Sequence, residues 1–303
     1  MTNKMTYNLY NNLVKLIFFS YIFLSCATSK VQNQVKTNAL EDDVFFFSGE
    51  RPIVNIIING EVFQFLIDTG TNYNLLTRVG IKKIIKRIQY YDYETIRKKP
   101  NTIINLHNEK IGDIKFNIET NDTTALYDGI LGMPFLMQKS NTVTFDFINH
   151  KIIFLPNNLN GMEEKLIPVS VENYPPLYFM EIKLNDSTEY FIIDTGNQTV
   201  ALRSNYDDEK SEYPTEELLL SLLNNDYNKT NRFKKLKLPD FSYSSTKYNN
   251  LVAVYNDYIF SKADGSARKV LSKFSSAGFP FFENRIVQIN FDNNTIIIVN
   301  KCS

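Results

Sequence analysis

Two copies of the tripeptide Asp-Thr-Gly carry the clearest chemical signal in this chain of 303 residues. They are Asp68-Thr69-Gly70 and Asp194-Thr195-Gly196, and each follows an apolar run typical of a β-strand. One such turn has a purely structural explanation, because Gly accepts backbone angles that other residues avoid. Two turns can bring two carboxyl groups together, one to act as a general base and the other as a general acid.

Both tripeptides belong to a longer internal repeat. Each Asp is followed by a matching block, Gly132-Met133-Pro134-Phe135 in the first half and Gly278-Phe279-Pro280-Phe281 in the second. A Phe-Asp pair begins 13 residues after each glycine, at Phe145 (145 − 132 = 13) and at Phe291 (291 − 278 = 13). A repeat in register over this length indicates a tandem duplication and favours a functional role for both aspartates.

The charge balance excludes strongly basic or acidic classes of protein. Lys plus Arg and Asp plus Glu number 33 each, so no strong field favours a nucleic acid, and we expect no nucleic-acid partner. His107 and His150 are isolated, and we expect them to pack or lie at the surface, since a metal needs several converging ligands. We therefore expect no metal site and no organic cofactor.

The N-terminus is typical of a secretion signal. Lys4 and Lys15 precede the apolar run 16–24, which is shorter than the about 20 residues that span a bilayer, and we predict a signal peptide over residues 1–25. The ending Leu24-Ser25-Cys26 resembles the lipobox of bacterial lipoproteins, in which the Cys is acylated. This resemblance implies a bacterial cell-envelope protein anchored to the membrane by lipid on Cys26. Ordinary secretion, an uncleaved anchor and a chance Cys are the alternatives.

The remaining cysteine, Cys302, would have no partner for an intramolecular disulfide if Cys26 carries lipid. The fold would then depend on its hydrophobic cores. Residues 26–43 are polar and lack periodicity, and we predict that they form a tether.

From Val44 onward the patterns predict an all-β chain. Asn59-Gly60, a pair typical of a type I′ hairpin turn, separates strands predicted at 52–58 and 61–67, the second of which leads into Asp68. A similar hairpin leads into Asp194. Its strands and the others are predicted at residues 177–184, 189–193, 102–107, 113–119, 142–147, 151–155, 250–260, 285–291 and 295–299.

Two segments depart from the strand pattern. Residues 81–88 predict a short helix or an irregular segment, and residues 215–223 a firmer helix, because Pro214 precedes the run and acidic residues occupy its first turn. This helical insertion would explain the longer spacing in the second half, 84 residues (278 − 194) against 64 (132 − 68). We divide the chain into an N-terminal lobe, 44–156, a linker loop, 157–167, and a C-terminal lobe, 168–303.

The repeat resembles the pepsin-like and retropepsin-like aspartic peptidases, over residues from about 50 to 300. In that family each half supplies one Asp-Thr-Gly, followed by Ser, Thr or Ala and later by Ile-Leu-Gly. The first half matches with Thr71 and Ile130-Leu131-Gly132, whereas the second half has Asn197 and Ser276-Ala277-Gly278.

The resemblance implies two acid-protease-like β-barrel lobes with an active-site cleft between them. It also implies an aspartic endopeptidase acting on a peptide or protein substrate, and we expect a monomer. Asp68 and Asp194 would share a water as base and acid, since like charges about 3 Å apart do not both ionise.

The same resemblance assigns supporting roles around these two aspartates. Thr69 and Thr195 would interlock the two turns through hydroxyl hydrogen bonds to the opposite backbone. Gly70 and Gly196 would let the chain pass close to the carboxylates without a Cβ. Thr71 would donate to Asp68 and favour its ionised form, and the Asn197 amide would donate to Asp194 in place of a hydroxyl.

Two other functions compete with hydrolysis. A non-catalytic peptide- or protein-binding surface lipoprotein on the same fold would explain the departures at Asn197 and Ser276, whereas a purely structural surface lipoprotein leaves the paired motifs unexplained. Tyr90, Tyr91 and Tyr93 lie where a substrate-covering flap would follow Asp68, and packing or surface exposure explains them equally well. They stay outside the catalytic set.

Overall fold

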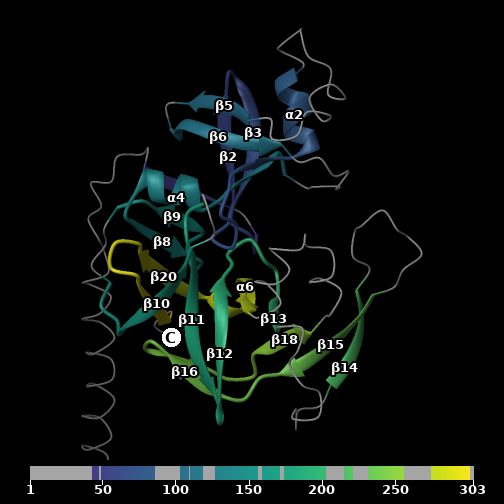
Figure 1. Ribbon diagram of the computed structural model, residues 1–303, viewed down its shortest axis with the longest axis vertical. Coiled ribbons are helices and arrows are strands. Elements are labelled where there is room, and N and C mark those ends of the chain that lie inside the picture. The colour runs from purple at the N-terminus through teal and green to yellow at the C-terminus, as the bar shows by residue number, and fades with distance from the viewer. Residues whose placement is uncertain are drawn as a thin grey trace, which may run out of the picture. The chain divides into compact units, whose positions relative to one another are not determined.

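Alternating apolar residues build most of the secondary structure of this computed structural model (Figure 1). It describes residues 43–47, 49–85, 103–108, 110–118, 127–155, 159–170, 174–202, 215–220, 231–255 and 274–300. All of them lie within one compact unit, Leu40–Lys301. These residues are predominantly β-strand, which confirms the prediction of a mainly β protein.

The first half of the repeat forms a six-stranded sheet in the order β2-β3-β7-β4-β6-β5. β2 and β3 join through Asn59 and Gly60, whose φ angles of 51° and 79° are both left-handed, as a type I′ turn requires. β3 runs antiparallel to β2 and parallel to β7. The strands are β2 (Ile53–Ile58), β3 (Glu61–Ile67), β4 (Leu75–Leu76), β5 (Ile103–Asn108), β6 (Gly112–Ile118) and β7 (Gly129–Leu131).

The second half repeats this strand order as β11-β12-β19-β13-β18-β15-β14. β12 runs antiparallel to β11 and parallel to β19, and β13 lies between β19 and β18, as β4 lies between β7 and β6. The duplication expected from the sequence is therefore present in the topology. The strands are β11 (Leu177–Leu184), β12 (Ser187–Ile193), β13 (Val200–Leu202), β14 (Thr215–Leu220), β15 (Asn231–Lys237), β18 (Val252–Tyr255) and β19 (Ser275–Ala277).

Strands from both halves share one sheet, in the order β1-β9-β8-β20-β21-β10. β8 of the first half pairs antiparallel with β20 of the second, and these are the strands that contain or precede the repeated Phe-Asp pairs. Through the pairing of β10 with β11 this sheet continues into the second-half strands. The strands are β1 (Val44–Phe46), β8 (Thr142–Asp146), β9 (Lys151–Ile153), β10 (Glu163–Val169), β20 (Arg285–Asn290) and β21 (Thr295–Asn300), beside a separate hairpin of β16 (Phe241–Tyr243) and β17 (Thr246–Tyr248).

Two sequence-based expectations about local structure are wrong. Residues 215–220, expected to be helical, form β14, which pairs with β15 from Thr215↔Leu236 to Leu220↔Asn231. A short apolar run fits a helix or a strand, and here a partner strand satisfies its backbone groups. Residues 163–167, expected in a loop, belong to β10, because this segment has β21 on one side and β11 on the other.

Three helices occur among the described residues. α2 (Arg78–Ile85) confirms a helix for the first part of the predicted segment 81–88, and residues 86–88 lie outside the described part of the chain. α4 (Met133–Lys139) and α6 (Phe279–Phe282) begin directly after Gly132 and Gly278 and were not predicted. The Pro in the first turn of each is a helix-start signal that the strand-dominated interpretation missed.

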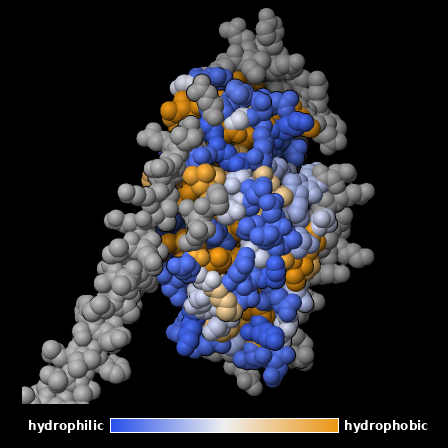
Figure 2. Space-filling view, turned by 90° about the vertical axis from the view of Figure 1, so that its left-hand side faces the viewer, coloured by the Kyte–Doolittle hydropathy of each residue, from blue (hydrophilic) through white to orange (hydrophobic). Residues whose placement is uncertain are grey.

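Phenylalanine rings connect the two halves in a continuous core. Phe147, just after β8, stacks on Phe282 of α6 at 5.8 Å and meets Phe279 edge-on at 6.0 Å. On the face shown in Figure 2, hydrophilic residues surround separate hydrophobic patches. None of the described helices has the length and apolar character to cross a membrane.

Candidate active site

Each half holds its aspartate in the same way, at the end of a strand that has an antiparallel neighbour on one side and a parallel neighbour on the other. The Asp68 N–H, directly after β3, donates to the Leu131 carbonyl of β7 at 3.0 Å. The Asp194 N–H, directly after β12, donates to the Ala277 carbonyl of β19 at 3.1 Å. The two parallel strand pairs thus place both Asp-Thr-Gly turns at equivalent positions in the repeated topology.

Thr69 and Thr195 lock the two turns to each other. The Thr69 hydroxyl donates to the Ile193 carbonyl at 2.7 Å and accepts from the Thr195 N–H at 3.1 Å. The Thr195 hydroxyl donates to the Ile67 carbonyl at 3.0 Å and accepts from the Thr69 N–H at 3.2 Å. Both threonines are buried, so water does not compete for these bonds, and four reciprocal hydrogen bonds fix one turn against the other.

The two glycines bring each turn against the opposite carboxyl group. A Cβ on Gly70 would lie 2.6 Å from Cγ of Asp194, and a Cβ on Gly196 would lie 2.6 Å from Cγ of Asp68. No non-bonded carbon contact is normally so short, so at both positions only glycine fits this approach. The structure therefore brings Asp68 and Asp194 together, 126 residues apart in sequence (194 − 68).

Asp68 sits in a set of donors that suits a carboxylate. Its Oδ1 accepts from the Gly70 N–H at 2.8 Å, and its Oδ2 accepts from the Thr71 hydroxyl at 2.6 Å. Its side chain is almost fully buried, at 8% exposure. Both oxygens of the Asp68 carboxyl group are therefore held by donors from its own turn.

Asp194 takes its hydrogen bond from a residue that the sequence did not identify, Ser276. The Ser276 hydroxyl donates to Asp194 Oδ2 at 2.9 Å, while the Asn197 Nδ2 donates to the Ser276 Oγ at 3.1 Å. The expectation that the Asn197 amide itself donates to Asp194 is therefore wrong. The side chain of Asn197 acts on the carboxyl group through Ser276, and its backbone N–H contributes a direct hydrogen bond that lowers the pKa of Asp194.

The orientation of Asn197 follows from its neighbour Thr199. The Asn197 Oδ1 accepts from the Thr199 N–H and from the Thr199 hydroxyl, both at 3.0 Å. A backbone N–H can only donate, so the amide oxygen faces Thr199 and the NH₂ group faces Ser276. Because that NH₂ group occupies a lone pair on Ser276, the serine proton is directed to Asp194.

Ser276 explains how the second half differs from the first. In the first half, Thr71 supplies the hydroxyl, and Ile130 of β7 pairs with Leu66. In the second half, Asn197 replaces that threonine, and Ser276 of β19, paired with Ile192, supplies the hydroxyl from the neighbouring strand. The sequence signal was that both departures fall in the same half, but only the pairing of β19 with β12 connects them.

The surroundings of Asp194 favour its protonated form. Burial raises the pKa of Asp194 well above its ordinary value, and the negative charge of Asp68 raises it further, against the lowering effect of the Ser276 hydrogen bond. Asp194 nevertheless keeps some exposure to solvent, so water has access to it. One member of the pair can thus hold a proton while the other accepts one.

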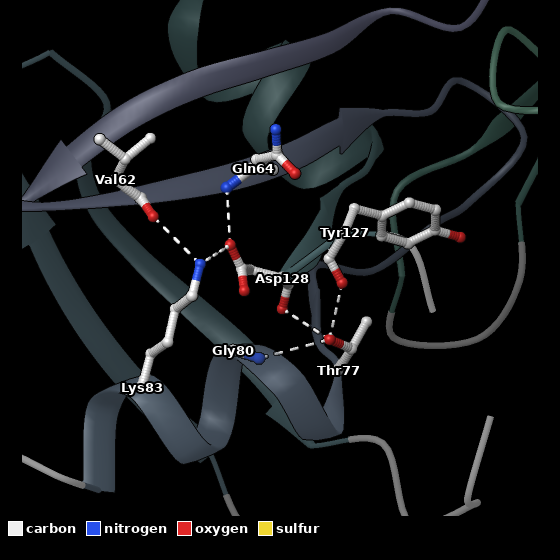
Figure 3. Close-up of polar contacts among 7 residues, drawn as sticks. All are labelled: Val62, Gln64, Thr77, Gly80, Lys83, Tyr127 and Asp128. Carbon is white, nitrogen blue, oxygen red and sulfur yellow. Dashed lines mark hydrogen bonds and ion pairs between the residues drawn. The ribbon is translucent and has the colours of Figure 1, made fainter. Parts of the chain in front are cut away.

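A polar network joins α2 to β3 and to the residues just before β7 (Figure 3). The buried Asp128, just before β7, accepts at Oδ2 from the Gln64 N–H at 2.8 Å and from Lys83 Nζ at 2.6 Å. Lys83 on α2 also donates to the Val62 carbonyl at 3.1 Å, and the Thr77 hydroxyl donates to the Asp128 carbonyl at 3.0 Å. These bonds tie α2, β3 and β7 together, and β3 and β7 are the strands that hold Asp68.

Several predicted features lie outside the described residues. These are the signal peptide over 1–25, Cys26, most of the tether and the tyrosines at 90, 91 and 93. Within the described part of the chain, no three His, Cys, Asp or Glu side chains gather as a metal site would require. The expectation that no metal or cofactor is needed stays a prediction.

Comparison with known proteins adds no identification. No model of a known protein family matches this chain, and no curated protein matches it by sequence. The assignment of function therefore depends on the repeat and on the geometry around the two aspartates.

Proposed function

We propose that this protein is an aspartic endopeptidase that hydrolyses peptide bonds through a water activated by Asp68 and Asp194. One observation carries the proposal: two Asp-Thr-Gly turns from the two halves are locked by reciprocal threonine hydrogen bonds, with each glycine against the opposite carboxyl group. Turns with only a structural role would need neither the close approach nor two unequal carboxyl environments. We also propose that the two halves form the two lobes of an acid-protease fold, because their strands follow the same order.

The unequal environments assign the two roles. Asp68, ionised, takes a proton from the water as the water oxygen attacks the substrate carbonyl carbon. Asp194, protonated, gives its proton to the carbonyl oxygen, so a neutral tetrahedral diol forms and no charge builds up on it. Collapse of the diol returns a proton to Asp194, transfers one from Asp68 to the departing nitrogen, and breaks the C–N bond. Both carboxyl groups end in their starting states.

Side-chain contacts in the second half support a working carboxyl pair rather than a degraded one. Asn197 and the segment Ser276-Ala277-Gly278 differ from the family pattern, which favoured a binding protein without turnover. In the structure Asn197 holds Ser276, and Ser276 donates to Asp194, so the two departures together restore a hydroxyl contact. We therefore favour hydrolysis over binding alone.

Cleavage of an unstructured protein tests the proposal directly. The purified chain should cut unfolded casein at mildly acid pH, and a peptide mimic with a secondary hydroxyl at the scissile position should block the cut. Such mimics resemble the tetrahedral diol and bind more tightly than substrates. Binding of the mimic with no hydrolysis over a range of pH would favour the non-catalytic alternative instead.

Ser276→Ala should move the alkaline limb of the pH profile of kcat/KM to higher pH. Removing the hydroxyl takes away a bond that favours ionised Asp194, so the pKa of Asp194 rises, and loss of its proton ends the active form. Asn197→Ala should move the limb in the same direction but less far, because it only frees the Ser276 hydroxyl to rotate. Ser276→Thr, which keeps a hydroxyl, is the control. An unmoved limb in Ser276→Ala would show that this contact does not act on the dyad.

We propose that lipid on Cys26 anchors the protein to the bacterial cell envelope, as the ending Leu24-Ser25-Cys26 favours. Cys26→Ala should release the protein from the membrane fraction and remove the lipid mass from its N-terminus, because the apolar run is too short for a stable span. Ser25→Ala, which keeps a small residue before the Cys, is the matched control. Membrane attachment of the Cys26 variant would favour an uncleaved anchor.

A further inference from the structure

A cavity of about 850 Å³ lies in the second half, and its lining includes neither aspartate. Its wall comes from the turn after α6, from the loop between β17 and β18, and from β18, the end of β15 and the last residue of β21. Gln198 and Thr199, four and five residues after Asp194, also line the cavity. An occupant would therefore lie beside the segment that follows the second Asp-Thr-Gly turn.

The charges on this wall favour an anion. Lys237 and Arg285 line the cavity against one acid, Glu283, which leaves a net charge of +1 (2 − 1). Among the described residues, no carboxylate lies within ion-pair distance of either cation. The Lys237 side chain is exposed, so its ammonium group is available to a ligand.

Arg285 is a fixed, partly buried charge rather than a mobile surface group. Its Nη1 donates to the carbonyls of Phe281 at 3.1 Å and Glu283 at 2.9 Å, and its guanidinium lies 4.4 Å from the centre of the Tyr248 ring. Its buried Nε has no hydrogen-bond partner among the described residues. Burial lowers the pKa of Arg285 and raises that of Tyr248, so Tyr248 stays neutral and supplies no counter-charge. The nearby Glu283 partly offsets the charge of Arg285, and Lys237 leaves the lining with a net positive charge.

Exposed amide side chains give the cavity a second chemical character. An amide offers both a donor and an acceptor, the same pair that a peptide backbone presents. Leu251 and Val252 add apolar surface between the polar groups. The amides are those of Gln198, Asn249, Asn250, Asn284 and Asn300.

We propose that this cavity binds a peptide segment that carries a carboxylate, with Lys237 pairing with the carboxylate and the amides pairing with the peptide backbone. The carboxylate belongs to an acidic side chain or to a free C-terminus, and both have the same chemistry at Lys237. Asp240, whose Oδ1 accepts from the Asn250 N–H at 3.4 Å, places a negative charge beside the loop between β17 and β18 and would repel a carboxylate there, so the carboxylate of the peptide is expected at Lys237. The site needs no turnover, so it stands independently of the proposed hydrolysis.

Fluorescence anisotropy with three labelled hexapeptides tests this site in the full chain carrying Asp194→Asn, which prevents cleavage during the measurement. The first peptide has a central Glu and both ends blocked, the second has Gln in its place, and the third has Gln with a free C-terminal carboxylate. At least one carboxylate peptide should bind about tenfold or more tightly than the blocked Gln peptide, as expected for one charge-assisted contact. Which of the two binds identifies the source of the carboxylate.

Lys237→Gln should remove this preference, whereas Lys247→Gln, at an exposed lysine of β17 outside the lining, should keep it. Arg285 is too embedded for a clean substitution, so a charge swap supplies the second test: Lys237→Glu should reverse the preference in favour of a peptide with a central Lys. Equal binding of all three peptides would overturn the proposal. A carboxylate preference that survives Lys237→Gln would overturn it as well.

Discussion

Asp68→Asn and Asp194→Asn should each lower kcat/KM for a peptide substrate by about four orders of magnitude or more, since residues that act as a unit lose nearly everything when one is removed. Without Asp68 no base takes the proton from the water. Without Asp194 no acid protonates the carbonyl oxygen. Asn has nearly the size of Asp, so the threonine bonds that lock the turns should survive either change.

Thermal unfolding provides the check that these variants stay folded. The folded-state pKa of Asp194 is raised, so its contribution to stability is fully present below the unfolded pKa, about 3.9, and is lost as pH rises through the folded pKa. The side chain introduced by Asp194→Asn does not ionise, so this variant does not lose this stability. The Tm of the variant should therefore fall less than the Tm of the parent protein as pH rises to neutrality. Asp186→Asn, at an exposed carboxylate in the turn between β11 and β12, should leave both activity and Tm unchanged. Retained hydrolysis in either dyad variant would exclude the shared-water mechanism.

Much of the fold could be predicted from the sequence because the same pattern of strands and motifs occurs twice in the chain. The hairpins that end at Asp68 and Asp194 follow from alternating apolar residues and, in the first, from Asn59-Gly60, whose left-handed angles only a few residues accept. Local sequence patterns could not predict which distant segments pair as strands. Residues 215–220 carry helix-start signals and yet form a strand, because β15 offers them a ladder of six residue pairs. Residues 163–167 likewise form a strand because β21 and β11 pair with them.

The candidate site shows a similar division between local and distant information. Both aspartates, their threonines and glycines stand in a fixed local motif, so the sequence alone could name them. Ser276 could not be found in that way, because its importance lies in a contact with Asp194 across 82 residues (276 − 194). The motif predicts a hydroxyl donor after the second glycine, but only the pairing of β19 with β12 shows that the donor comes from the next strand.

Gly70→Ala should lower kcat/KM by about a hundredfold or more and destabilise the protein by about 1–3 kcal/mol, the usual range for overpacking a tight site. The added Cβ would lie 2.6 Å from Cγ and 2.8 Å from Oδ1 of Asp194, closer than any real Cβ contact allows. One turn must therefore move, and it cannot move without stretching the bonds between Thr69 and Thr195. The carboxyl groups would then lose the spacing that lets them share one water.

The equivalent glycine of the second turn, Gly196, allows a matched substitution. Gly196→Ala places its Cβ 2.6 Å from Cγ of Asp68, so both substitutions should impair activity to a similar extent. Gly60→Asn is the control, because that glycine lies in a hairpin turn with nothing within 4 Å of its Cβ position, and Asn tolerates its φ of 79°. It should leave kcat/KM unchanged. Full activity in Gly70→Ala would mean that the two turns do not face each other at this distance, and the shared-water dyad would lose its geometric basis.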